Sequence, residues 1–242
     1  MNSNLLDFLK VHFMYEMNRK AETPMKLMVS EVQMKREVMK RFTFIIKPTK
    51  VNEMGLKNQI TKSEHLEWER FQLLLHQMER DGEITFYLLF ALGGYTGLRI
   101  SDILDLTWKE LIEADKISVI EKKTRKKRVI DLNQVLKEII NKCYQGQNLD
   151  EYVFRGAGKD GKLSVQHVNR KIKTIFSKYK IRGRYSSHFM RKTLGRRVWE
   201  QNGCSEKALI LLSDILQHSS LKMTKIYLNI TEEEIRDVYI NL

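Results

Sequence analysis

Cysteine and proline are both scarce in this sequence. The only two cysteines, Cys143 and Cys204, lie far apart and form no CxxC pattern, so we predict neither a disulfide framework nor a zinc knuckle. A chain without disulfides fits a reducing, intracellular compartment. Two prolines and twelve glycines interrupt a chain rich in Leu, Ile, Lys, Glu and Met at helical spacing. This pattern predicts a mainly helical fold with a small strand component.

Long hydrophobic runs are also missing. No stretch reaches the ~18 uninterrupted apolar residues that suggest a membrane-spanning helix, so we predict no membrane span. The amino-terminal sequence MNSNLLDFLKVHFMYEM carries Asp7 within its apolar part and lacks a basic start, which argues against a signal peptide. Apolar residues still make up 42% of the 242 residues, which is enough to bury a core.

Basic residues, in contrast, are in clear excess. Lysine and arginine number 43 against 30 acidic residues, which gives a formal net charge of +13 and a pI near 9.6. This balance is typical of proteins that meet a polyanion, and it favours nucleic acid over an anionic membrane surface. Charge alone leaves open a basic protein without a specific partner.

Turn-forming residues divide the chain into two parts. Amphipathic helices are predicted at 5–18 and 25–42, followed by a linker at 47–57 that contains proline and glycine. We therefore predict a short helical segment with its linker over 1–56 and a larger domain over 57–242.

The larger domain begins with a predicted capping box, in which Thr61 is the N-cap of a helix and Glu64 follows three residues later. A second helix is predicted over 84–92. The glycine-rich sequence 93–97 should end it, and a short helix follows at 98–106.

Residues 116–132, KISVIEKKTRKKRVIDL, have the pattern of a β-hairpin with its turn at 124–126. Six of the seven residues over 122–128 are basic, so the turn is suited to contacting a DNA backbone. A solvated basic turn and a nuclear-import patch are the alternatives. The residues that we assign to DNA binding are Lys122, Arg125, Lys126, Lys127 and Arg128.

Two arginines each lie three residues from a second polar side chain. His188 and Arg191 lie on a predicted helix for which Ser186 and Ser187 are the candidate caps; they share a helix face and can hold one phosphate. Arg99 and Asp102 have the same spacing, and a carboxylate there can orient a guanidinium whose planar fork suits phosphate oxygens. Either pair alone is more often an ordinary helix-surface pair.

His218 and Tyr227 are nine residues apart, which places them on opposite sides of one continuous helix. Ser219 and Ser220 between them are N-cap types. We therefore predict that a new helix begins there, with His218 on the preceding turn and Tyr227 at the end of the new helix. A core or interface position is the alternative for an isolated tyrosine.

Four segments together resemble the signature motifs of the tyrosine site-specific recombinases, the phage integrase family. The resemblance covers residues 58–242 and includes the family's order of motifs. It implies the tyrosine recombinase catalytic-domain fold, mainly α with a small antiparallel β-sheet (α+β), and makes residues 1–56 a reduced core-binding domain. The four segments are TGLRISDILDL, EKKTRKKRVIDL, SSHFMRKT and ILQHSSLKMTKIYL.

The resemblance also implies a role for each residue of the site. Arg99 and Arg191 would be two clamps on the scissile phosphate, and Asp102 would support the first clamp. Lys123 would be the general acid for the leaving 5′ oxygen, His188 and His218 would assist, and Tyr227 would be the nucleophile.

Two features of the motifs differ from the family pattern or leave a choice open. Lys122, Lys126 and Lys127 are rivals to Lys123 for the general acid, because all four lie in the same basic run. The family's usual glycine before the third-motif histidine is Gln217 here, a change that affects the local turn.

The implied reaction cleaves and rejoins double-stranded DNA through a covalent 3′-phosphotyrosine, with no metal and no ATP. This is chemically reasonable, because two guanidiniums, an imidazole and an ammonium can stabilise the charge that builds on the attacked phosphate. A catalytically idle DNA-binding regulator and a type IB topoisomerase-like relaxing enzyme are the alternatives.

The implied partners are double-stranded DNA and further copies of the chain, as a dimer to tetramer on DNA, with no membrane partner. An accessory DNA-bending protein remains open. The implied location is the cytoplasm, in a bacterial, phage or mobile-element context. After Tyr227, a capping box and an apolar stripe predict a final helix, and we expect residues 232–242 to dock on a neighbouring protomer.

Overall fold

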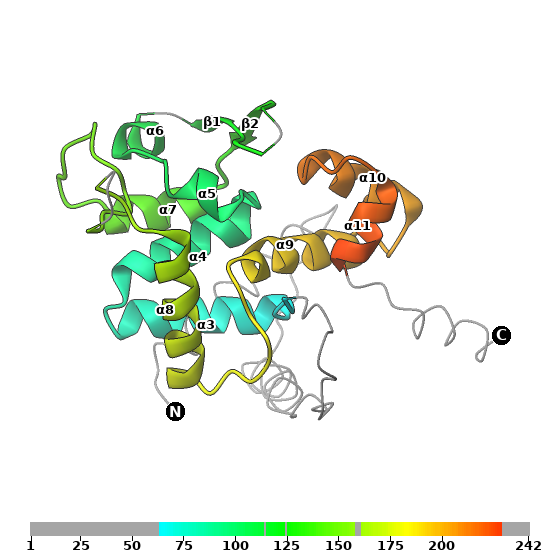
Figure 1. Cartoon of the computed structure of the whole chain (residues 1–242), viewed down its shortest axis with the longest axis horizontal. Helices are drawn as coiled ribbons and strands as arrows, with labels where there is room; N and C mark the ends of the chain where they lie inside the picture. The colour runs from blue at the N-terminus through cyan, green and yellow to red at the C-terminus, as the bar shows by residue number, and fades with distance from the viewer. Residues whose placement is uncertain (1–62, 114, 124, 158–160, 229–242) are drawn as a thin grey trace, which may run out of the picture. The chain divides into compact units, whose positions relative to one another are not determined.

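The computed structural model describes residues 63–113, 115–123, 125–157 and 161–228 (Figure 1). In these ranges helices predominate and two strands form an antiparallel pair, which confirms the predicted fold class. The elements are α3 (Trp68–Arg80), α4 (Ile84–Thr96), α5 (Ile100–Ile103), α6 (Trp108–Ile112), β1 (Lys116–Ile120), β2 (Lys127–Asp131), α7 (Gln134–Cys143), α8 (Val165–Lys178), α9 (His188–Gln201), α10 (Glu206–Ile215) and α11 (Leu221–Leu228).

Several predictions fall outside the described residues. These are the amino-terminal helices, the linker after them and the docking segment at 232–242. The division of the chain near residue 56 therefore stays a prediction. Within the described ranges, no helix is both long enough and apolar enough to cross a lipid bilayer.

Helix α4 forms the centre of the domain because its sequence is apolar on every side. It packs against α3, α7 and α9. Aromatic rings fill the space between these helices and α8: the centroid of Phe189 lies 5.0 Å from that of Phe90 and 4.9 Å from that of Phe176, both at steep angles. The core thereby fixes the start of α9, where a predicted site residue is located.

The predicted end of α4 at residue 92 is wrong, because the helix continues through two glycines to Thr96. Their role is close packing. A Cβ on Gly94 would lie 2.3 Å from the Phe71 ring, and one on Gly93 would lie 2.5 Å from the sulfur of Met190. The helix ends one turn later at Gly97, whose φ of +62° gives the left-handed cap that glycine favours.

Three other helix boundaries differ from prediction. Helix α3 begins after Glu67, so Glu64 lies outside it; the Glu64 carboxylate accepts the backbone N–H of Arg184 instead, and Thr61 lies outside the described residues. The short helix α5 covers only four residues. Helix α6 was not predicted, although Thr107 and Glu110 form the capping box that starts it.

The hairpin is confirmed, with β1 and β2 paired antiparallel. Ile117 lies opposite Ile130, and Val119 lies opposite Arg128. Ile117 is fully buried and Arg128 nearly so, at 8% exposure, so this face of the hairpin points into the domain. The alternation of a strand therefore turns one residue of the basic run inward.

Helices α10 and α11 pack on the far part of α9 through a second, smaller apolar cluster (Figure 1). A new helix does begin after the two serines, as predicted: α11 starts at Leu221, and the Ser220 hydroxyl accepts the backbone N–H of Met223 at 3.3 Å. The apolar cluster consists of Leu209, Leu212, Leu216 and Leu228.

Candidate active site

Arg191 lies in the first turn of α9 and is 3% exposed. Its guanidinium donates hydrogen bonds to two backbone oxygens, that of Gly97 after α4 and that of Leu216 after α10. Burial lowers the pKa of Arg191 to about 10, which leaves the group cationic at neutral pH. A fixed positive charge is thus held between the ends of two helices.

Arg99, immediately before α5, pairs with an acid on the hairpin. Its Nη1 donates to Oε2 of Glu121, which is fully buried. The other oxygen, Oε1, faces Nη1 of Arg128 at 3.3 Å, and Nη2 of Arg128 donates to the backbone oxygen of Thr96 at 2.6 Å. One buried carboxylate therefore joins guanidiniums from two distant segments.

The carboxylate that contacts the Arg99 guanidinium belongs to Glu121, and the predicted support of Arg99 by Asp102 stays a prediction. Oδ1 of Asp102 accepts the backbone N–H of Lys122 at 3.1 Å, and its buried Oδ2 has no hydrogen-bond partner among the described residues. Burial raises the pKa of Asp102, and the nearby Glu121 charge adds to that effect. Asp102 thus joins α5 to the hairpin turn.

The turn between α10 and α11 sets the position of His218. Gln217 adopts φ +47°, and the N–H of His218 donates to the backbone oxygen of Ser213 at 2.9 Å, which closes the carboxyl end of α10. The imidazole Nδ1 lies 3.0 Å from the hydroxyl of Thr224 on α11. Burial, together with the charges of Arg191 and other cations, lowers the pKa of His218 to about 4, so the ring is neutral at pH 7.

Tyr227, near the end of α11, packs its ring among charged groups. The ring centroid lies 5.0 Å from that of His218, 5.4 Å from Nζ of Lys192 and 5.9 Å from Cζ of Arg191. The hydroxyl oxygen is buried and makes no hydrogen bond within the described ranges. Burial raises the pKa of Tyr227 to about 12, against the opposing charges of Arg191 and Arg99.

His188 and Lys123 complete the group. His188, the first residue of α9, is exposed; partial burial of its ring and the Arg191 charge lower its pKa, and Lys192, Lys123 and Arg99 contribute in the same direction. Lys123 also contributes to the lowered pKa of His218, so its ammonium is close enough to act on both rings.

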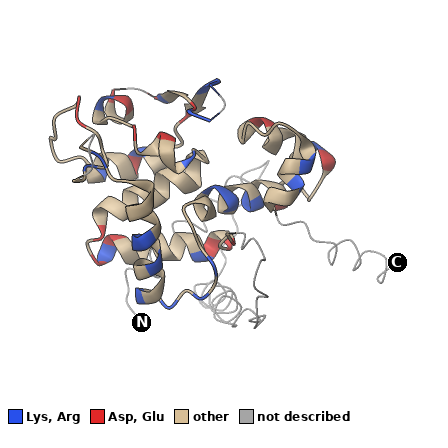
Figure 2. Cartoon of the chain, in the orientation of Figure 1, with Lys and Arg blue, Asp and Glu red and all other residues tan. Residues whose placement is uncertain are grey.

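The remaining residues assigned to DNA binding divide by burial. Lys122 pairs with Asp105 at 2.5 Å, which draws its ammonium to the base of the hairpin. Lys126 and Lys127 are exposed, as is Arg125, whose φ is +59° at the turn. Figure 2 shows basic residues at the hairpin and along α9.

Arg128 differs from the other residues assigned to DNA binding. Its guanidinium is buried and engaged by Glu121 and by the backbone oxygens of Thr96 and Gly97. These contacts indicate a structural role, and a contact of Arg128 with DNA stays a prediction.

Two residues near the site were missed from the sequence. Glu121 was hidden because it precedes a basic run and burial of one acid among lysines has no sequence signal. Lys192, which is 6% exposed beside the Tyr227 ring, follows Arg191 directly and reads as a surface lysine. Strand alternation is the one signal that could have indicated the inward position of Arg128.

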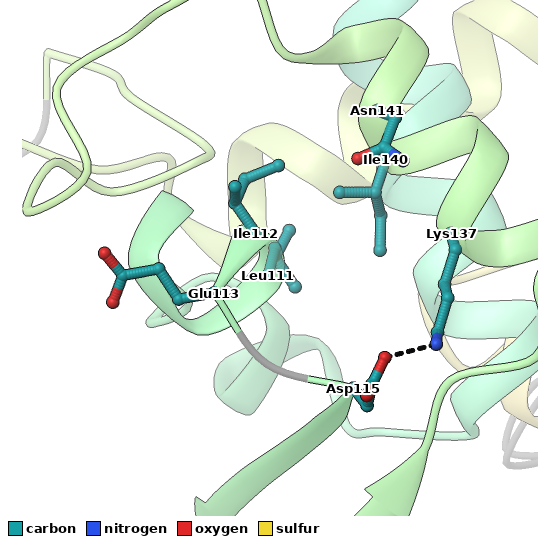
Figure 3. Close-up of a pocket in the computed structure, with 7 residues that line it drawn as sticks. All are labelled: Leu111, Ile112, Glu113, Asp115, Lys137, Ile140 and Asn141. Atoms are coloured by element: carbon teal, nitrogen blue, oxygen red, sulfur yellow. Dashed lines mark hydrogen bonds and ion pairs between the residues drawn. The ribbon is translucent and has the colours of Figure 1, made fainter.

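A separate hollow of about 240 Å³ lies beside α6, β1 and α7 and shares no residue with this group (Figure 3). The ion pair between Lys137 and Asp115 lies at its edge. Among the described residues, no set of three or more His, Cys, Asp and Glu side chains is placed to hold a metal ion. The residues lining the hollow are Leu111, Ile112, Glu113, Asp115, Lys137, Ile140 and Asn141.

A mainly helical domain in which Arg191, Lys192 and His218 contact a tyrosine with a buried hydroxyl, next to Arg99 and a two-stranded hairpin, has the architecture of the tyrosine recombinases. The profile of the phage integrase family matches residues 64–234. The chain therefore belongs to the phage integrase family and is a tyrosine recombinase by family.

Curated relatives and solved structures agree with this. The chain is 31% identical over 168 residues to the probable integrase/recombinase YoeC of Bacillus subtilis (strain 168), covering 69% of this chain and 87% of YoeC. It is 26% identical over 164 residues to the tyrosine recombinase XerD of Rhizobium meliloti (strain 1021), covering 66% of this chain and 51% of XerD. It thus spans most of YoeC but only about half the length of XerD.

Solved structures show the same fold at low sequence identity. The crystal structure of XerA recombinase matches with a TM-score of 0.56 at 18% identity, covering 98% of this chain and 90% of that one. The Tn1549 transposon integrase, in complex with a circular intermediate DNA, matches with a TM-score of 0.56 at 19% identity, covering 92% of this chain and 80% of that one.

Proposed function

We propose that this chain is a site-specific recombinase that cleaves and rejoins double-stranded DNA through a covalent 3′-phosphotyrosine on Tyr227. The observation that carries the proposal is the placement of Tyr227: its ring lies against His218 of the α10–α11 turn and against Arg191 and Lys192 of α9. A tyrosine whose buried hydroxyl lies near two cations is suited to attack an anion, because those cations can stabilise the charge that builds during the reaction.

The reaction follows from the groups present. The Tyr227 oxygen forms a bond to phosphorus while the bond from phosphorus to the 5′ oxygen breaks. The phenol proton passes to a neutral imidazole, for which His188 is our candidate because its lowered pKa keeps it unprotonated at pH 7. Lys123 donates a proton to the leaving 5′ oxygen. Reversal by a new 5′ hydroxyl needs no ATP, because the phosphotyrosine conserves the phosphodiester.

The guanidiniums of Arg99 and Arg191 stabilise the extra negative charge on the attacked phosphate. They are held before the substrate arrives, since Glu121 engages one and backbone oxygens engage the other. His218 donates a further hydrogen bond to a phosphate oxygen. In this proposal the protein supplies all the charge stabilisation, without a metal ion.

Double-stranded DNA is the proposed partner. Copies of the chain are proposed to assemble on it as a dimer to tetramer, in the cytoplasm. The net charge of +13 supports DNA binding. Related structures also support it: one XerH recombinase is bound to a palindromic difH substrate, and one lambda integrase dimer is bound to a core site. Residues 1–56 are the proposed reduced core-binding domain.

Contact between protomers through residues 232–242 is part of the same proposal. Helices α10 and α11 expose apolar side chains that offer a surface for such a segment. Deleting residues 232–242 should weaken assembly on DNA and strand exchange together; unchanged assembly and exchange would reject this part. The exposed side chains are Ile210, Leu211, Leu221, Met223 and Ile226.

Covalent trapping tests the proposal. The protein is incubated with nicked duplexes taken from DNA beside its own gene, and adducts that resist denaturant are separated by electrophoresis. We expect an adduct with wild type and none with Tyr227→Phe, which removes only a hydroxyl that makes no hydrogen bond among the described residues. DNA binding without any adduct would favour a regulator, and relaxation of plasmid without a specific site would favour a topoisomerase.

A further inference from the structure

Glu121 occupies a position that the proposed chemistry does not explain by itself. It is fully buried, yet it lies two residues before Lys123 at the end of β1. Burial of a carboxylate is unfavourable unless cations surround it, and two guanidiniums do so here. The acid must therefore be considered together with Arg99 and Arg128.

The two guanidiniums around Glu121 are held to different degrees. Arg128 is 8% exposed and is fixed by three acceptors: the acid itself and the backbone oxygens of Thr96 and Gly97. Arg99 keeps 15% of its side chain exposed, and among the described residues its guanidinium is held by this acid. Arg128 thus anchors Glu121, and Glu121 in turn anchors Arg99.

The backbone oxygen of Gly97 extends this chain of contacts to the other clamp. It accepts hydrogen bonds from Arg128 and from Arg191. The two arginines proposed to hold the scissile phosphate are therefore joined by one series of contacts, which runs from Arg99 through Glu121 and Arg128 to Gly97 and Arg191.

We propose that Glu121 is a positioning residue for DNA cleavage, which holds the guanidinium of Arg99 in the orientation that receives the scissile phosphate, with Arg128 as its anchor. The inference rests on the proposed function, because it needs a phosphate at Arg99. Without Glu121 the Arg99 side chain regains its rotamers, and a displacement of ~1 Å in such a group lowers the rate of a chemical step by ~100-fold.

The test separates positioning from stability. Glu121→Gln removes the charge that holds Arg99 but leaves Arg128 buried without a counter-ion, so it should also destabilise the fold. A second change, Arg128→Gln, restores the balance of charge. Glu138→Gln, on the exposed face of α7, is the matched control that removes one acid elsewhere.

The rate of adduct formation is measured at saturating DNA, next to the thermal midpoint and the dissociation constant for DNA. We expect Glu121→Gln to slow adduct formation by about 10- to 100-fold with DNA affinity changed by less than ~3-fold. In the double variant the thermal midpoint should recover while the rate stays low. Glu138→Gln should match wild type.

Two results would overturn the inference: a rate that recovers together with stability in the double variant, or a loss that appears only in DNA affinity. Glu121→Asp keeps the charge and serves if the glutamine variants do not fold; because its carboxylate is withdrawn from Arg99, it should slow cleavage at unchanged affinity. If wild type itself forms no adduct, the proposed function fails. In that case the NMR signal of Arg99 Nε–Hε decides whether Glu121 orients the Arg99 side chain. The group should be ordered in wild type and should be averaged by motion in Glu121→Asp.

Discussion

The imidazole of His218 and the phenol of Tyr227 meet at a ring-centroid distance of 5.0 Å and an interplanar angle of 65°, although nine residues separate them. One continuous helix would have placed them on opposite sides. The turn at Gln217 and the new helix α11 bring them together. Burial at this contact shifts both groups: the pKa of His218 falls to about 4, and the pKa of Tyr227 rises to about 12.

Acid should reveal the state of His218. Its folded pKa of about 4 lies below the usual value near 6.5, so the unfolded chain binds a proton that the folded protein excludes. The stability that this group contributes is complete above about pH 6.5 and is lost as the pH falls towards 4. We expect the free energy of unfolding, measured with urea, to be about 1–2 kcal/mol lower at pH 4.5 than at pH 7, a range that is already discounted for partial exposure.

The matched variant for this experiment is His218→Gln, which cannot gain a proton. Its unfolding free energy should fall less than that of wild type over the same pH interval. Equal slopes for the two proteins would show that His218 is not excluded from protonation in the folded state.

Lys123 and Lys122 should differ in their effects on cleavage. Lys123 influences both histidines, whereas Lys122 pairs with Asp105. If Lys123 is the general acid, Lys123→Gln should slow adduct formation by about 10²- to 10⁴-fold. Lys122→Gln is its neighbouring control and should change DNA affinity more than rate. When sulfur replaces the leaving 5′ oxygen of the duplex, the leaving group needs no proton, so this duplex should restore the rate of adduct formation by Lys123→Gln. If it does not restore that rate, the assignment of Lys123 as the general acid is contradicted.

Gln217→Gly should stabilise the protein. A non-glycine residue at φ +47° is strained, and glycine at the end of a helix removes the strain. The glutamine amide also donates to the backbone oxygen of Asp214 at 2.9 Å, an exposed bond of small value. We expect a gain of about 0.5–1 kcal/mol in urea unfolding. Cys204→Gly, at φ +54° on an exposed turn, should give a similar gain; a loss in both variants would refute the argument.

Gly94→Ala tests the packing of α4 on α3. Alanine is the better helix former by about 1 kcal/mol, so propensity alone predicts stabilisation. The added Cβ would lie 2.3 Å from the Phe71 ring, and we expect a net loss of about 1–3 kcal/mol in thermal or urea unfolding. The second change Phe71→Leu should recover part of this loss. A stabilised Gly94→Ala protein would show that the helices can move apart at no cost.

The glycines of α4 also show where sequence reasoning reached its limit. Gly93 and Gly94 predict a break from local propensity, but tertiary packing against Met190 and Phe71 reverses that preference. The α10–α11 turn was predictable because two serines marked a new helix start. Local signals therefore predicted a helix end correctly only where the capping residues determined it and tertiary packing did not override them.

The site shows the same division. Arg99, His188, Arg191 and His218 could be proposed because the short segments that carry them resemble family motifs, and such motifs are local in the sequence. The partner of Arg99 could not, since Glu121 is 22 residues away and reaches it only after the hairpin folds back. Arg128 shows a related limit: one residue in a basic run turns inward, and a count of charges cannot show which.

The backbone oxygen of Gly97 receives Arg128 and Arg191 at once. An acceptor that belongs to the main chain is present whatever residue the gene encodes, so no substitution at this position can delete it. Substitution can only redirect it, by moving φ away from +62°. The orientation of both guanidiniums therefore depends on the backbone conformation at residue 97. A substitution at this residue should change the geometry of the site and leave all of its charges in place.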